Sequence, residues 1–148
     1  MSQQIKTLFL YLIMGCNLHV IGRELDTITL LSAIKMKPYK IKNKGEPRAI
    51  KKPEGQIMTY SVVSFLASDA DFDDFEKQKE DVIAFILINK EDLIAIKNNS
   101  EVEYFNFDFG IANKMKWHQS TYFEPDFISL LATYGIGIEL TMYLDSEQ

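Results

Sequence analysis

Alternating apolar and polar positions predict four β-strands in this chain. The pattern is clearest over residues 101–110, where Phe105, Phe107 and Phe109 point one way and polar side chains between them point the other. A period of two is typical of a strand with one buried face. The predicted strands cover residues 7–21, 58–67, 101–110 and 136–144.

Apolar residues at helical spacing predict helices between these strands. Asp26 is expected to cap the first helix, because an aspartate at this position accepts hydrogen bonds from free backbone N–H groups. One face of the longest helix is apolar except for Lys79. Gly135 ends the last helix. The predicted helices cover about residues 26–35, 72–88, 90–97 and 124–134.

The order of these elements predicts one α+β domain over residues 1–148. Two strand–helix–strand halves, joined by a helical segment, are typical of a two-layer sandwich. We therefore expect a four-stranded, mainly antiparallel sheet with the helices on one face, a variant of the ferredoxin-like arrangement. The chain of 148 residues is 47% apolar, which is enough for a core of its own.

A short sequence echo raises the question of internal duplication. Residues 24–31 (ELDTITLL) return as residues 124–131 (EPDFISLL), with five identities at matching positions. Duplication of one strand–helix–strand unit explains the match. Convergence explains it equally well, because acidic residues near a helix start and apolar residues on its inner face suit any short amphipathic helix.

The first predicted strand is apolar on both faces, as in a central strand or one that meets a partner chain. A homodimer through the second face is therefore one expectation. The same run resembles a bacterial lipoprotein signal, because apolar residues 7–14 lead into Gly15 and Cys16. Only Lys6 supplies positive charge before the run, so we favour a strand in which Gly15 marks a bulge or bend.

Composition narrows the class of partner and the compartment. The net charge of −5 argues against broad affinity for nucleic acid, which needs a positive field. No apolar stretch is long enough to cross a membrane. The single cysteine excludes an internal disulfide and is typical of a reducing compartment, so we expect a cytoplasmic protein.

Short motifs in a fixed order resemble a known family. The matching positions are residues 18–26, 28–29, 44–46 and 127–131, together with Pro38, Gly135 and Tyr143. In this order they resemble the bacterial domain-of-unknown-function family 4279 over residues 16–143. Thr27 stands where members often have Pro, and Tyr60 takes the place of the aromatic residue, often Trp, that opens their second strand. The resemblance implies a small α+β domain and transfers no catalytic residue.

Half of the basic residues gather after the first helix. Residues 35–52 hold eight of the sixteen Lys and Arg against one acid, Glu46, so the stretch carries +7 and the remainder −12. We interpret residues 35–56 as a long loop that binds an acidic partner, a phosphate group or nucleic acid. The alternative is a solvated loop folded onto the acidic run at 69–76, where exposed pairs contribute about 0–1 kcal/mol each. The candidate contacts are Lys40, Lys42, Lys44 and Arg48.

A second polar loop, residues 111–123, adds Trp117, His118 and Tyr122 as candidate partner contacts. An exposed tryptophan is a good interface anchor. Tryptophan is highly buried on average, however, so we expect the Trp117 side chain to fold over the edge of the core.

Sets of catalytic or metal-binding residues are poorly represented. Cys16 and His19 are three residues apart on a strand, so their side chains should point to opposite faces. The two histidines, His19 and His118, form no zinc-binding spacing with the cysteine. The acidic run at 69–74 lacks the glycine and the later glutamate of a calcium loop. We expect neither metal nor cofactor.

These features favour a non-catalytic protein-binding module, for example an immunity-type protein that neutralises a toxin. Its contact surface would combine the loops 35–56 and 111–123. The rival hypothesis is a small-molecule sensor or enzyme with a pocket between the sheet and these loops. That version requires the side chains of Asp108, His118 and Tyr122 to converge in one concave site.

Overall fold

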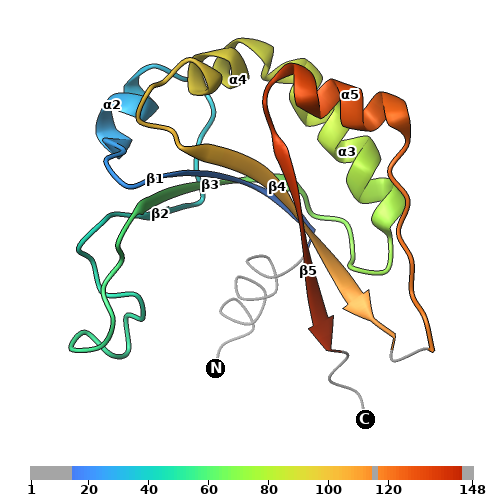
Figure 1. Cartoon of the computed structure of the whole chain (residues 1–148), viewed down its shortest axis with the longest axis horizontal. Coiled ribbons are helices and arrows are strands. Elements are labelled where there is room, and N and C mark those ends of the chain that lie inside the picture. The colour runs from blue at the N-terminus through green and yellow to red at the C-terminus, as the bar shows by residue number, and fades with distance from the viewer. Residues whose placement is uncertain (1–14, 115–116, 145–148) are drawn as a thin grey trace.

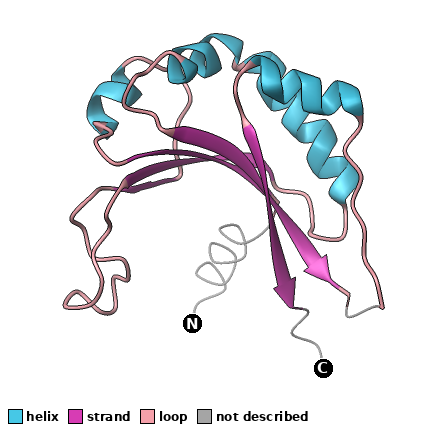
Figure 2. Ribbon diagram, in the orientation of Figure 1, coloured by secondary structure: helices cyan, strands magenta, loops and turns pink. Residues whose placement is uncertain are grey.

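A computed structural model describes residues 15–114 and 117–144 of the chain. The described part contains a β-sheet and a layer of helices (Figures 1 and 2). Its elements are β1 (Cys16–Gly22), α2 (Thr27–Ser32), β2 (Lys40–Lys42), β3 (Ser61–Ser68), α3 (Phe75–Ile88), α4 (Lys90–Lys97), β4 (Tyr104–Asn113), α5 (Pro125–Thr133) and β5 (Gly137–Leu144).

The sheet has five strands in the order β2-β3-β1-β4-β5 and is mixed. The β4–β5 pair is parallel, whereas the other neighbouring pairs are antiparallel. The prediction of four mainly antiparallel strands is therefore wrong in two respects. Helix α5 carries the chain back over the sheet, so β5 enters in the same direction as β4. Strand β2 was missed because it has only three residues, inside the basic stretch.

All helices of the described chain lie on one side of the curved sheet (Figure 1). The core forms between this side and the helices, and its largest fully buried side chains include Phe65, Phe107 and Phe109. Helices α3, α4 and α5 contribute Val82, Leu93 and Leu131 to the same core. This arrangement of helices on one side of a sheet confirms the predicted α+β class. No helix in the described ranges is long and apolar enough to cross a membrane.

Strand β1 is central, as its apolar character suggested. Its pairing with β3 is irregular between Cys16 and Asn17, directly after Gly15, which confirms the predicted bulge or bend. The second face of β1 is only partly apolar, since it carries Asn17, His19 and Ile21. The rest of the predicted strand, residues 7–14, and with it the lipoprotein question, lies outside the described residues.

The two copies of the echo do not occupy equivalent positions. Asp26 is the N-cap of α2 and accepts hydrogen bonds from the backbone N–H groups of Ile28 and Thr29. Its counterpart Asp126 lies inside the first turn of α5, where Glu124 is the N-cap. The helices therefore start two residues apart within the echo. Helix α5 links the neighbouring strands β4 and β5, whereas β3 lies between β1 and β2, the strands that flank α2, so the structure gives no support to duplication.

Candidate functional site

One face of the sheet carries no helix from residues 15–114 and 117–144, and we call it the open face. Strand register decides which side chains lie there, because directly paired residues share a face. His19 pairs with Ser64 on one side and with Asn106 on the other, and Lys40 pairs with Ser64. Asp108 pairs with Glu139. Polar and charged side chains from all five strands therefore meet on the open face.

A chain of polar contacts crosses this face from one edge of the sheet to the other. The His19 Nδ1 atom lies 2.8 Å from the Ser64 hydroxyl oxygen, and His19 Nε2 lies 3.7 Å from Asp108 Oδ2. The Thr141 hydroxyl donates to Asp108 Oδ1 at 2.7 Å. We assign the proton of a neutral His19 to Nε2, facing the carboxylate, which leaves Nδ1 to accept from Ser64. Each side chain in this row of polar contacts fixes the orientation of the next.

Tyr39, immediately before β2, extends the chain at the first edge. Burial raises the pKa of its phenol, while a hydrogen bond to Ser64 opposes the rise and the nearby charge of Asp108 adds to it. At the other edge, burial raises the pKa of Tyr143, with Asp108 and Glu139 adding to the effect. Both phenols therefore stay neutral donors near the carboxylates over the physiological pH range.

The β4–β5 end of the open face presents hydrogen-bond acceptors. The Asn106 amide donates to Glu139 Oε2 at 2.7 Å, which fixes the amide so that its oxygen points away from this carboxylate. That oxygen is buried and has no hydrogen-bond partner among the described residues. The more accessible carboxylates of Asp108 and Glu139 make this end suited to a cation or an N–H donor.

The opposite edge presents the basic residues. Residues 43–60, which we call the basic arm, form an ordered two-stranded extension of β2 and β3. Gly45 N–H donates to the Met58 carbonyl at 2.8 Å, and Arg48 N–H donates to the Gln56 carbonyl at 2.8 Å. The predicted long irregular loop is therefore in part a hairpin. Its tip exposes Ile50 beside Lys51.

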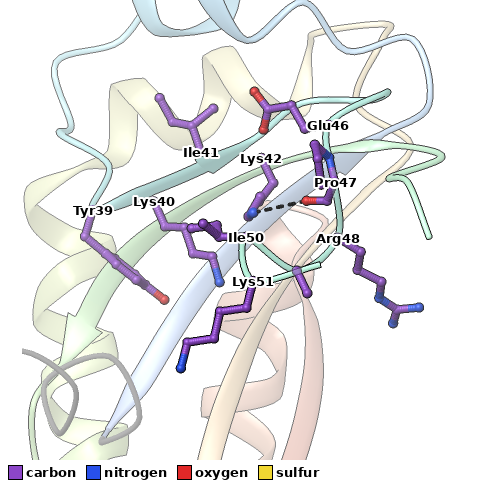
Figure 3. Close-up of a pocket in the computed structure, with 10 residues that line it drawn as sticks. Tyr39, Lys40, Ile41, Lys42, Glu46, Pro47, Arg48, Ile50 and Lys51 are labelled. Atoms are coloured by element: carbon purple, nitrogen blue, oxygen red, sulfur yellow. Dashed lines mark hydrogen bonds between the residues drawn. The ribbon is translucent and has the colours of Figure 1, made fainter. Parts of the chain in front are cut away.

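The basic arm and β2 enclose an open hollow of about 940 Å³. Its walls combine basic and apolar side chains, and Figure 3 shows those of Lys40 and Lys51 extending in the same direction while Arg48 points away from them. The Lys42 ammonium donates to the Pro47 carbonyl at 3.4 Å, which ties the strand to the arm. Ten residues line the hollow, namely Tyr39, Lys40, Ile41, Lys42, Glu46, Pro47, Arg48, Ala49, Ile50 and Lys51.

A second hollow joins the basic arm to the open face. It shares Lys40, Lys42 and Arg48 with the first hollow and also touches Asp108 and Glu139. Positive charge thus lies at one end of a continuous surface and negative charge at the other. His19 and Ser64 line the middle of this surface.

The lysines of residues 35–52 do not fold onto the acidic run at 69–76. Lys35 pairs instead with Glu91, and Lys44 forms a short ion pair with Glu24. Among the ion pairs of residues 15–114 and 117–144, none joins the two stretches. The structure therefore does not show the alternative in which the basic stretch folds onto the acidic run at 69–76. Lys44 is the one predicted contact of the arm that is already engaged by a carboxylate on another segment.

The segment between β4 and α5 lies at the other end of the sheet from the basic arm (Figure 1). Trp117 is 100% exposed, so the expectation that its side chain covers the core edge is wrong. Its neighbour His118 is also exposed. The predicted contact surface is therefore split into two separate regions, one containing Lys40, Lys42 and Arg48 and the other Trp117.

Tyr122 is exposed, and its backbone carbonyl accepts a hydrogen bond from the buried Lys79 ammonium at 3.1 Å. Burial alone would lower the pKa of Lys79, but hydrogen bonds to Glu124 and Glu76 raise it overall. In the described chain, no hydrogen bond or ion pair links Asp108 to His118 or Tyr122. The structure does not bring these three residues together as the rival hypothesis requires.

The Ser64 hydroxyl on the open face is not accessible for nucleophilic attack. Ser64, His19 and Asp108 have the residue types of a hydrolytic triad, but Ser64 is only 3% exposed, so a substrate cannot reach its hydroxyl. The described residues contain no group of His, Cys, Asp and Glu suited to hold a metal ion. Cys16, on the helix side of β1, is fully buried, and burial raises its pKa well above the usual range.

Sequence reasoning considered His19 with Cys16 and with His118 and did not connect it with Ser64. One signal was present, because polar residues 17 and 19 interrupt a strand that is otherwise apolar. No family model, no curated protein and no solved structure matches this chain. The resemblance to family 4279 therefore stays a prediction.

Proposed function

We propose that the protein is a non-catalytic protein-binding module that holds a partner on the open face and the basic arm. The observation that carries the proposal is the separation of charge along one continuous surface. Lys40, Lys42 and Arg48 lie at one end, and Asp108 and Glu139 lie at the other. A surface with this pattern selects partners by charge complementarity and disfavours those of the wrong sign.

The geometry indicates the shape of the contact. From β2 to β4 the sheet order spans three strand spacings of roughly 4.8 Å, or about 14 Å. A partner segment that carries acidic groups at one end and a basic group about 14 Å away matches both ends. Exposed Ile50, at the tip of the basic arm, adds apolar contact area where the partner's acidic groups would bind. An immunity-type protein, which neutralises a toxin by covering part of it, is the specific form of this proposal.

Charge reversal tests the surface directly. Partners are captured from the native strain with a tagged chain that carries a photo-crosslinking residue at Ile50, and each partner is then purified for calorimetry. Replacement of Lys40, Lys42 and Arg48 by Glu should weaken binding roughly tenfold to a hundredfold, because each exposed contact contributes about 0.5–1 kcal/mol. The matched control reverses Lys35, Lys90 and Lys97, which belong to the helix side of the molecule.

Equal loss of affinity in both variants, or no loss in either, would contradict the proposal. A chain that carries the photo-crosslinking residue at Ile28 on α2 serves as a second probe. If the partner crosslinks to position 28 and not to position 50, the contact lies on the helix layer and the proposal is contradicted. The rival function, a small-molecule sensor, predicts a different result. A free zwitterion would then raise the melting temperature of the purified chain, and Asp108→Asn would abolish this rise. The capture experiment would then find no protein partner.

A further inference from the structure

The outer edge of the sheet at β5 has the features of a pairing surface. None of the eight residues of β5 is buried. The register with β4 places the apolar side chains of β5 on the helix side of the sheet, where β4 carries Phe107 and Phe109. These β5 side chains are nevertheless exposed, namely Ile138, Leu140, Met142 and Leu144. Within the described ranges, no strand pairs with the outer side of β5. Unpaired backbone groups therefore coincide with a row of exposed apolar side chains.

The two edges of the sheet differ in the protection that normally prevents edge pairing. Natural edges are short, or carry lysine or proline, or are covered. Strand β2 is three residues long, contains Lys40 and Lys42, and continues into the basic arm. Strand β5 is eight residues long, has no lysine, arginine or proline, and has Glu139 as its one charged residue. A long, apolar and unprotected edge needs a partner strand.

We propose that β5 pairs with β5 of a second copy of this chain, in antiparallel orientation, to give a continuous sheet of ten strands. The sequence of β5 is complementary to itself when Thr141 lies on the two-fold axis. Leu140 then faces Met142 of the second copy and Ile138 faces Leu144, so apolar side chains meet on the helix side. On the open face Glu139 faces Tyr143, whose hydroxyl is a donor for the carboxylate.

This self-complementarity favours a second copy over a strand of another protein. The like charges of the two Glu139 residues are kept apart, because each lies opposite a tyrosine. The arrangement leaves the basic arm, at the far edge of the sheet, free in both copies. It also places the dimer contact at an edge strand, whereas the sequence had suggested the second face of the first strand.

Sedimentation equilibrium of the full chain tests the dimer. The wild-type chain should show a concentration-dependent dimer, and Met142→Lys should weaken dimerisation at least tenfold, because a lysine on each strand would face an apolar residue. Met142 is 59% exposed, so the monomer should tolerate this change. The control is Ile94→Lys on α4, where the replaced side chain is 49% exposed. A chain that is monomeric at several hundred micromolar, or a dimer that Met142→Lys leaves intact, would overturn the proposal.

Cysteine crosslinking tests the register. Directly opposed residues of an antiparallel pair have Cα atoms about 4.5–5.5 Å apart, which is within the range of a disulfide. Thr141→Cys should form an intermolecular disulfide under mild oxidation, while the buried Cys16 does not compete. Ser129→Cys on the exposed side of α5 is the control. Failure of the Thr141→Cys variant to crosslink, while the Ser129→Cys control does so, would exclude this pairing and overturn the proposal.

Discussion

Two glycines with nearly the same backbone angle differ sharply in what surrounds them. Gly15 has a φ of +86° and Gly45 a φ of +87°, so alanine is unfavourable at both. A Cβ atom at Gly15 would lie 1.8 Å from the Ser68 carbonyl oxygen, whereas a Cβ at Gly45 would meet nothing within 4 Å. Comparison of Gly15→Ala with Gly45→Ala therefore separates the cost of the collision from the cost of the backbone angle.

The structure sets the expected size of each effect. At Gly45 only the left-handed backbone is penalised, which costs about 1–2 kcal/mol for alanine. At Gly15 the end of β3 must also move by more than an ångström. That movement strains packing by about 1–3 kcal/mol and loosens the 2.8 Å hydrogen bond from Ser68 to Asp81, worth about 1 kcal/mol. Gly15→Ala should therefore cost about 3–6 kcal/mol of unfolding free energy.

Urea unfolding followed by far-UV circular dichroism measures both variants against the wild type. Alanine reduces the freedom of the unfolded chain by the same amount at both sites, so this contribution cancels in the comparison. The Gly15 variant should lose at least about 2 kcal/mol more than the Gly45 variant. Equal losses, or a larger loss at Gly45, would show that the close approach of Gly15 to Ser68 is not a feature of the folded protein.

Three further changes test other contacts. Asp92 accepts the backbone N–H groups of Lys35 and Met36 at 2.9 and 2.7 Å, so Asp92→Ala should cost about 3 kcal/mol in urea unfolding and Asp92→Asn about half as much. A hydrogen bond from Lys77 lowers the pKa of Asp81. The stability that this carboxylate contributes is therefore present above about pH 4 and is lost as the pH falls through its folded-state pKa. The difference in urea midpoint between the wild type and Asp81→Asn should shrink from pH 7 to pH 3. Burial, more than the charge of Asp108, raises the pKa of Cys16, so a thiol reagent at pH 8 should label the native chain only as fast as it unfolds, with or without Asp108→Asn.

Local patterns were a sound guide to the elements and a poor guide to how they join. Asp26 caps α2 as predicted, because a cap depends on residues next to one another in the chain. Helix α3 starts at Phe75, later than the apolar spacing suggested, since Phe72 stacks on Tyr143 with ring centroids 4.6 Å apart. The parallel β4–β5 pair depends on where the last helix returns the chain, which no local pattern encodes. A three-residue strand such as β2 is too short for periodicity to reveal.

The polar chain on the open face lay beyond sequence reasoning for the same reason. Ser64 and His19 are 45 residues apart, and the two residues of the Asp108–Thr141 hydrogen bond are 33 apart. Their approach depends on the strand order and on the register of each pair. Charge clustering needs no such knowledge, so the sequence did indicate Lys40, Lys42 and Arg48. Among the acceptors at the other end of the surface, the sequence indicated Asp108 only together with His118 and Tyr122, and it did not indicate Glu139.

The polar chain has a structural consequence that connects the fold with the proposed function. A slip of one residue in any strand would turn its side chains to the opposite face. Ser64, His19, Asp108 and Thr141 come from four adjacent strands, and their contacts form only when all the registers are correct. These polar contacts thereby fix the distance across the sheet between Asp108 and Lys40, because Lys40 pairs with Ser64. Under the function we propose, this fixed separation of opposite charges is what would let the surface discriminate between partners.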